Sequence, residues 1–168
     1  HQEEAMMMSD RIAVMHQGRI WQVGSPREVY ERPCNLFVAR FLGVSNELPG
    51  TIGSSIGEDR IFQPADGEQP PFPVRTVSTE LADRSATLSL RPEHIRMVRE
   101  RPSISDPVLS GRVEKVLFAG SDTKYLVRVG RDRVWETRMA SGASHAPFTA
   151  GDPVFLHWSL ADARVFVE

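Results

Sequence analysis

Few side chains in this sequence have the types and spacing needed for chemistry. The adjacent pair Glu93 and His94 is the clearest candidate for general acid–base catalysis, because a carboxyl and an imidazole can exchange protons near neutral pH. The pair follows Arg91 and Pro92, however, and a Pro-Glu corner at a strand end is more often structural. We therefore expect Arg91 and Glu93 to bond neighbouring backbone rather than to catalyse a reaction.

The remaining reactive side chains lack the patterns of known sites. His16, His94, His145 and His157 show neither a His-x-His nor a His-x-x-x-His spacing, so no metal site is predicted. Cys34 is the single cysteine, which excludes an internal disulfide and fits a reducing compartment. No catalytic partners surround Cys34, and we expect a small buried side chain. The sequence also contains no Gly-x-x-x-x-Gly-Lys-Ser/Thr loop, so it predicts no P-loop contact with nucleotide phosphates.

The composition is that of an ordinary globular chain. Of the 168 residues, 40% are hydrophobic and 25% are charged, and the net charge is -2. This balance gives no general attraction to nucleic acid or to anionic lipid. No apolar run approaches the ~20 residues of a membrane-spanning helix, and the acidic start does not resemble a signal peptide. We therefore expect no direct membrane insertion and contact with a membrane only through a partner protein.

The first part of the chain predicts a short mixed α/β segment. Residues 2–8 are good helix formers, and the apolar runs 12–15 and 20–23 flank a turn, as in a β-hairpin. Ser25, Pro26 and Glu28 have the arrangement of a helix start with a capping box. A further helix over 36–42 is predicted after a cap at Asn35.

Beyond residue 45 the pattern changes to short apolar runs separated by Gly, Pro, Asp and Ser. Alternation is clearest at Tyr125, Val127 and Val129, which share one face of a strand. Many short strands with regular turns predict a mainly β fold, a sandwich or small barrel, which could consist of two similar halves. The expected strands cover residues 48–52, 60–63, 73–78, 86–91, 108–118, 124–129, 133–139, 153–158 and 163–167.

Several motifs of the first part resemble the end of the ATP-binding cassette of ABC importers. The matching segments are Gln2–Ala5, Asp10–Met15, Gly18–Gly24, Pro26–Pro33 and the linker helix Asn35–Gly43. One position departs from the family, in which the switch histidine is followed by Asp and then Gln. Here Gln2 follows His1 directly, so we do not assign His1 the switch role.

The remainder resembles the OB-like regulatory domain of the same ATPases, the TOBE domain. The resemblance is carried by Leu90–Ile95, Gly111–Ser121, Gly151–Trp158 and the closing strand Arg164–Phe166. It marks eight residues as the structural and regulatory motif: Arg91, Pro92, Glu93, Gly120, Ser121, Gly151, Asp152 and Trp158. No catalytic, cofactor-binding or metal-binding residue is predicted.

The resemblance implies an organisation and a function. Residues 1–45 correspond to the end of the cassette with its linker helix, and residues 46–168 to an OB-like TOBE β-barrel. The chain would be the regulatory and dimerisation portion of a transport ATPase, forming homodimers and working with membrane permease subunits at the inner face of the cell membrane. ATP and Mg²⁺ would bind elsewhere in the parent protein, and this portion alone would not hydrolyse ATP. Residues 118–127 look closest to polyamine-type members.

Two alternatives stay open at this point. An autonomous OB-type domain could bind a small oxyanion through the backbone amides of Ala119, Gly120 and Ser121, or an oligonucleotide. The net charge and the expected burial of Trp135 and Trp158 speak against nucleic acid. In addition, a basic hairpin predicts either a solvated edge or a docking surface for a regulatory protein; its cations are Lys124, Arg128, Arg131, Arg133 and Arg138.

Overall fold

The computed structural model describes residues 2–75, 83–103, 105–142 and 147–167. The chain divides into two compact units, His1–Ser45 and Asn46–Glu168. His145 and part of the expected strand 73–78 lie outside the described residues. Among the described residues, no helix has the length and apolar character needed to cross a membrane.

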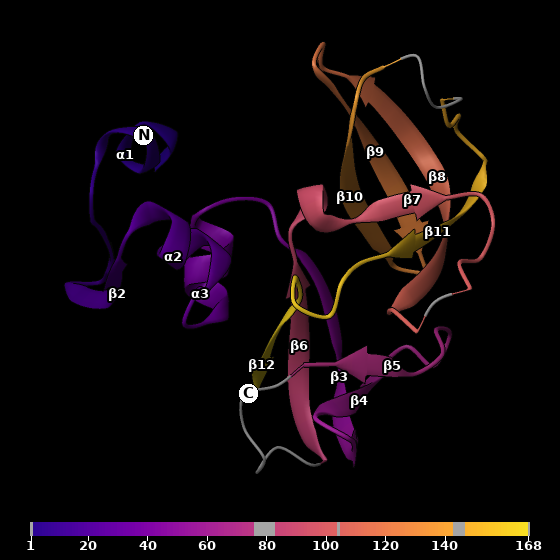
Figure 1. The fold of residues 1–168 in the computed structure, drawn as a ribbon, viewed down its shortest axis with the longest axis horizontal. Coiled ribbons are helices and arrows are strands. Elements are labelled where there is room, and N and C mark those ends of the chain that lie inside the picture. The colour runs from indigo at the N-terminus through magenta and orange to yellow at the C-terminus, as the bar shows by residue number, and fades with distance from the viewer. Residues whose placement is uncertain (1, 76–82, 104, 143–146, 168) are drawn as a thin grey trace. The chain divides into compact units, whose positions relative to one another are not determined.

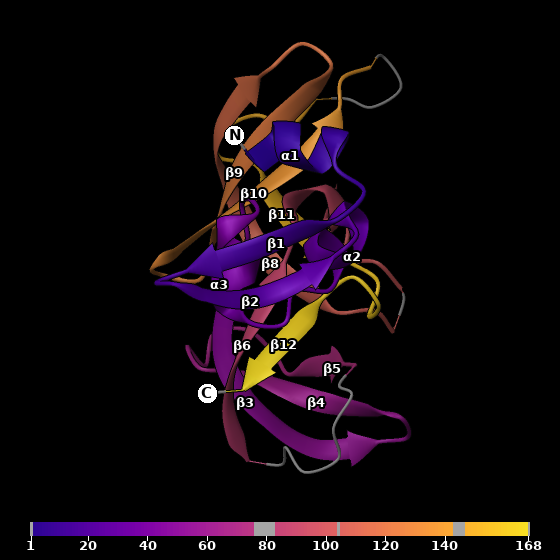
Figure 2. The same cartoon turned by 90° about the vertical axis from the view of Figure 1, so that its left-hand side faces the viewer.

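The first unit contains three short helices (Figure 1) and one hairpin, whose two strands are seen in Figure 2. Ser25 caps helix α2 by accepting a hydrogen bond from the backbone N–H of Glu28 at 3.2 Å, and Asn35 caps α3 in the same way from Val38 at 2.9 Å. Both caps confirm the sequence-based expectation. A small core forms from Val14, Val29, Val38 and Leu42. The elements are α1 (Gln2–Met8), β1 (Ile12–His16), β2 (Arg19–Gly24), α2 (Pro26–Glu31) and α3 (Leu36–Phe41).

The second unit consists of two five-stranded antiparallel sheets (Figures 1 and 2). One sheet has the order β12-β6-β3-β4-β5 and the other β10-β9-β8-β11-β7. Their bounds are β3 (Asn46–Ile56), β4 (Asp59–Pro64), β5 (Phe72–Val74), β6 (Arg84–Leu90), β7 (Arg96–Val98), β8 (Val108–Phe118), β9 (Asp122–Val129), β10 (Arg133–Ala140), β11 (Pro153–His157) and β12 (Arg164–Val167). The predicted mainly β, OB-like architecture is confirmed.

The two sheets repeat one plan and exchange one strand. A long strand with a β-bulge, β3 or β8, stands at the centre and is flanked by β4 and β6 or by β9 and β11. After β6 the chain crosses through a 3₁₀ turn, Pro92–His94, to add β7 to the second sheet. After β11 it crosses back to add β12 to the first sheet. Each half therefore completes the sheet of the other.

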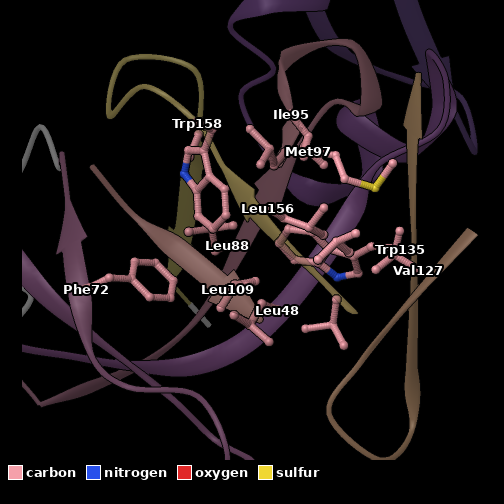
Figure 3. Close-up of a cluster of buried hydrophobic side chains, with 14 of the residues drawn as sticks. Leu48, Phe72, Leu88, Ile95, Met97, Leu109, Val127, Trp135, Leu156 and Trp158 are labelled. Atoms are coloured by element: carbon pink, nitrogen blue, oxygen red, sulfur yellow. The ribbon is translucent and has the colours of Figure 1, made fainter. Parts of the chain in front are cut away.

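One continuous core fills this unit (Figure 3). The ring of Trp158 lies 5.5 Å from that of Phe72 and 5.8 Å from that of Trp135. Leu48, Ile52, Leu88 and Leu109 are among its fully buried aliphatic side chains. The alternation in the sequence predicted these inward positions because strand residues face opposite sides of a sheet in turn.

Two details differ from the sequence-based expectations. Strand β7 was not predicted, because its three residues are too few to show alternation. Cys34 is exposed, contrary to the expected burial. The reason is its position after Pro33, where the side-chain amide of Gln22 holds the chain at the surface by accepting from the N–H of Cys34 at 2.8 Å and donating to the carbonyl of Arg32 at 2.9 Å.

Candidate functional site

The Arg91–Glu93 corner is the crossover between the two sheets. Pro92 opens the 3₁₀ turn, Arg91 is buried, and the N–H of His94 donates to the carbonyl of Arg91 at 3.1 Å. The hydroxyl of Thr137 on β10 donates to the carbonyl of Ile95 at 3.2 Å, which ties the corner to the second sheet. The geometry thus gives this corner a structural function in passing the chain from β6 to β7.

The imidazole of His94 points toward the second crossover rather than toward a reaction centre. Its Nδ1 lies 3.9 Å from the Asp162 carboxylate, in the turn between β11 and β12. This nitrogen is buried and makes no hydrogen bond within the described part of the chain. The His94–Asp162 approach therefore brings the two crossovers together.

The Gly120-Ser121 motif forms the tip of the β8–β9 hairpin. The N–H of Ala119 donates to the carbonyl of Asp122 at 2.9 Å, and Gly120 has a φ of +86° that favours glycine. The carbonyl of Ser121 accepts from the N–H of Ser141 at 2.9 Å. One of the three amides considered for oxyanion binding is therefore already used within the turn.

The Gly151-Asp152 motif attaches a turn to β8 just before its bulge. The N–H of Gly151 donates to the carbonyl of Val113 at 2.7 Å, and the N–H of Val113 donates to the carbonyl of Asp152 at 2.9 Å. The Asp152 carboxylate accepts from the N–H and the hydroxyl of Thr149 at 3.0 and 3.2 Å. These hydrogen bonds, with the nearby Arg99 guanidinium, lower the pKa of Asp152. The motif thus holds a turn in place.

Arg99 covers the same turn. Its guanidinium lies 4.3 Å from the ring centre of Phe148 and donates to the carbonyl of Pro147 at 3.0 Å. Phe148 in turn meets the ring of Tyr125 edge-on at 5.8 Å. The Arg99 guanidinium thus covers Phe148, and Phe148 packs against the buried ring of Tyr125. These contacts anchor the segment that carries the Gly-Asp motif to the core.

Trp158 belongs to the core and not to a ligand site. Only 1% of its surface is exposed, and both neighbouring rings pack against it (Figure 3). Its Nε1 makes no hydrogen bond within the described residues. The eight motif residues therefore lie at a crossover, a hairpin tip, a docked turn and the core, and do not converge on one pocket.

Several cations of the basic hairpin of β9 and β10 form ion pairs with acids that the sequence did not suggest. Arg128 Nε lies 2.6 Å from Glu114 Oε1, and Arg131 Nε lies 2.6 Å from Glu68 Oε1. Glu136 accepts from Arg138 at 2.9 Å, and this hydrogen bond raises the pKa of Arg138 above its ordinary value. The hairpin is thus an exposed edge that carries ion pairs, because neighbouring strands bring distant carboxylates beside it.

The described parts of the chain contain no group of three or more His, Cys, Asp or Glu side chains that could hold a metal ion. A cavity of about 240 Å³ beside the β9–β10 turn has mixed charge, from Asp66, Glu68, Arg131, Asp132 and Arg133. Its ion pair between Arg131 and Glu68 joins the β4–β5 loop to this turn. The cavity is therefore bordered by a charged contact between two loops.

The fold and these motifs define an OB-like β domain of the TOBE type, and residues 88–166 match the TOBE domain family. The fold is shared with a crystal structure of the cytoplasmic molybdate-binding protein ModG with molybdate bound, with a TM-score of 0.60 and 11% identity. That similarity covers 73% of this chain and 96% of the ModG chain.

The wider chain is similar to proteins named spermidine/putrescine import ATP-binding protein PotA. The protein from Lawsonia intracellularis is 41% identical over 75% of this chain and 34% of its own length. The one from Pseudomonas fluorescens is 32% identical over 99% of this chain and 44% of its own length. Nearly the whole chain is therefore similar to import ATP-binding proteins, and its second unit contains a match to the TOBE domain, as its motifs predicted. The chain spans less than half the length of these relatives.

Proposed function

We propose that this chain is the regulatory and dimerisation portion of the ATP-hydrolysing subunit of an ABC importer. The observation that carries the proposal is its similarity, over nearly all of its length, to import ATP-binding proteins, together with a TOBE domain. In this proposal the second unit of two chains pairs them as a homodimer, so that ATP hydrolysis in the parent protein is coupled to solute uptake.

The first unit would be the end of the ATP-binding cassette. Helix α1 buries none of its residues, and the side chains of Met7 and Met8 are 78% and 85% exposed. Exposed apolar residues at this density favour a contact with another part of the parent subunit. Because this sequence has no P-loop, ATP and Mg²⁺ would be held by a different segment of that subunit.

The solute is proposed to be a polyamine, as the names of the relatives indicate. Membrane permease subunits would be the partners of the parent protein, which would work at the cytoplasmic face of the cell membrane without inserting into it. A spermidine uptake assay with the full-length protein and its permease tests this proposal. Uptake should fall when the segment 46–168 is deleted, and unchanged uptake would count against a regulatory role.

The isolated chain should form dimers in light scattering and show no ATPase activity, while the full-length protein hydrolyses ATP. A chain that stays monomeric at high micromolar concentration would remove the dimerisation part of the proposal.

A second candidate is binding of a small oxyanion, favoured by the fold shared with ModG, whose structure contains molybdate. Calorimetric titration with molybdate and sulfate separates the two functions. Saturable heat that is lost on substitution at the β8–β9 tip would favour the oxyanion function, and its absence would leave the transporter function alone.

A further inference from the structure

The outer face of the β8–β9–β10 meander is a surface that the proposed function does not use. Tyr125, Val127 and Val129 of β9 are buried, so Leu126 and Arg128 face the opposite side. The strand register places Val134 of β10 opposite Arg128, and Arg128 opposite Arg112 of β8. We call this surface the arginine face; its members are Leu117, Leu126 and Val134 with Arg112, Arg128 and Arg138.

The centre of the arginine face is aliphatic and accessible. Leu117 is 38% exposed, Val134 is 43% exposed, and Leu126 between them is half-buried. An aliphatic centre bordered by arginines has the composition of protein–protein interfaces, in which arginine is enriched relative to the rest of the surface. The face therefore has the composition of a docking surface.

The arginines of this face are held in place before any partner binds. Arg128 donates to Glu114 at 2.6 Å and to the carbonyl of Arg131 at 3.1 Å. Arg112 donates to the carbonyl of Gly151 at 2.6 Å, and Arg138 is bound to Glu136. Because these side chains are already ordered, a partner would not have to immobilise them, which lowers the entropic cost of binding.

The face is positive in a chain that is negative overall. The three arginines are joined by Lys115 and Lys124. Glu114 and Glu136 are paired with these cations, and Glu93 and Asp122 add negative charge near Arg138. The whole chain has a net charge of -2, so this face has the opposite sign to the chain as a whole. A surface of this kind attracts a partner of opposite sign and steers its approach.

We propose that the arginine face docks an acidic surface of another protein. A second copy of this chain is disfavoured, because two copies of a face with net positive charge repel each other. Nucleic acid is disfavoured too, because the chain carries a net charge of -2 and the centre of this face offers aliphatic side chains instead of the aromatic rings on which single strands stack. The inference goes beyond the proposed dimer and does not depend on the transported solute.

The test is site-specific photocrosslinking of the full-length protein in its own cells. A photoreactive phenylalanine analogue at position 134 reports on the face. The same analogue at position 56 is the control, since Ile56 is an aliphatic strand residue that is even more accessible, 57% exposed against 43% for Val134. We expect an adduct with a protein of acidic surface at position 134 only, identified by mass spectrometry.

Charge reversal makes the test specific. Arg128→Glu with Arg138→Glu should reduce the adduct at least about tenfold. Arg131→Glu, which also breaks an ion pair but lies at the β9–β10 turn outside the face, should leave the adduct intact. Circular dichroism of each variant confirms that the fold persists.

Three results would overturn the proposal. They are an adduct with only a second copy of this chain, an adduct with nucleic acid, and adducts at position 134 no more abundant than those at position 56. Equal loss in the Arg131→Glu variant would also contradict it, because the effect would then not belong to the arginine face. None of these results bears on spermidine uptake, so the proposed transport function is tested separately.

Discussion

The side-chain amide of Asn46 makes both backbone hydrogen bonds of Glu136. Asn46 Nδ2 donates to the carbonyl of Glu136 at 2.7 Å, and the N–H of Glu136 donates to Asn46 Oδ1 at 2.8 Å. Strand β10 is the edge of its sheet, so the first residue of β3 takes the place of a missing neighbouring strand. Gln69 does the same for Ser110 of β8, at 3.0 and 3.1 Å. Carboxamides thus join loops and strand ends to the sheets.

Replacing Asn46 by Ala tests this relationship. The substitution leaves the backbone groups of Glu136 without their partner, and a buried polar group that loses its hydrogen bonds costs about 1–3 kcal/mol. We expect a loss of that size in the free energy of unfolding in urea and faster hydrogen exchange at the Glu136 amide. Gln63→Ala, at an exposed position of β4, is the control and should change little. Unaltered exchange at Glu136 would contradict this account.

The exchange of β7 and β12 predicts where the folding unit ends. A fragment of residues 88–166 matches the TOBE domain family but lacks β3, the central strand beside β6. We expect this fragment to be unfolded and the segment 46–168 to fold cooperatively. Circular dichroism with thermal melting distinguishes them. A sharp melting transition of the shorter fragment would show that the exchanged strands do not couple the two halves.

The lowered pKa of Asp152 predicts that the folded protein loses stability in acid. Hydrogen bonds from Thr149 and the charge of Arg99 lower the pKa of the Asp152 carboxyl in the folded state. The ionised carboxylate therefore stabilises the fold above its pKa in the unfolded chain, and this stabilisation is lost as the pH falls through its pKa in the folded protein. The variant Asp152→Ala should therefore melt below the wild type at pH 7, and the gap should close in strong acid. Melting curves between pH 2 and pH 7 measure it. A gap independent of pH would mean that packing, not the carboxylate charge, is responsible.

The lowered pKa of His157 predicts a second effect of pH on folding stability, at a higher pH than that of Asp152. Burial, and then the nearby Arg96, lower its pKa, against the opposing effect of Asp106. The imidazole of His157 therefore binds a proton more readily in the unfolded chain than in the folded one. The free energy of unfolding should keep its full value above the pKa of this group in the unfolded chain and should decrease as the pH falls below that pKa. His157→Gln cannot take up the proton, so its stability relative to wild type should improve between pH 7 and pH 5. NMR titration of the imidazole gives the direct check, and an ordinary or raised value would refute the prediction.

Local patterns predicted much of this fold, and partners distant in the sequence explain what they did not. The caps at Ser25 and Asn35 and the inward faces of β9 and β11 follow from short-range rules. The side-chain hydrogen bonds of Asn46 and Gln69 join residues that are 90 and 41 positions apart, so no local sequence pattern could predict them.

The predicted motif residues show the same division. The Arg-Pro-Glu corner and the Gly-Asp turn were recognised as structural units, but their attachment points on β10 and β8 depend on the register between strands. The compensation of Arg128 by Glu114 likewise depends on the bulge in β8, which moves Glu114 beside the guanidinium. The alternation of hydrophobic residues in the sequence does not predict this shift in strand register.

The coding sequence immediately upstream of His1 tests the central claim most directly. The account predicts a reading frame that continues back through a Gly-x-x-x-x-Gly-Lys-Ser/Thr loop, so that this chain is the regulatory portion of a transport ATPase. A start codon at or just before this segment, with no P-loop in frame, would contradict the account. The domain would then act alone, and binding of a small ligand would become the function to test.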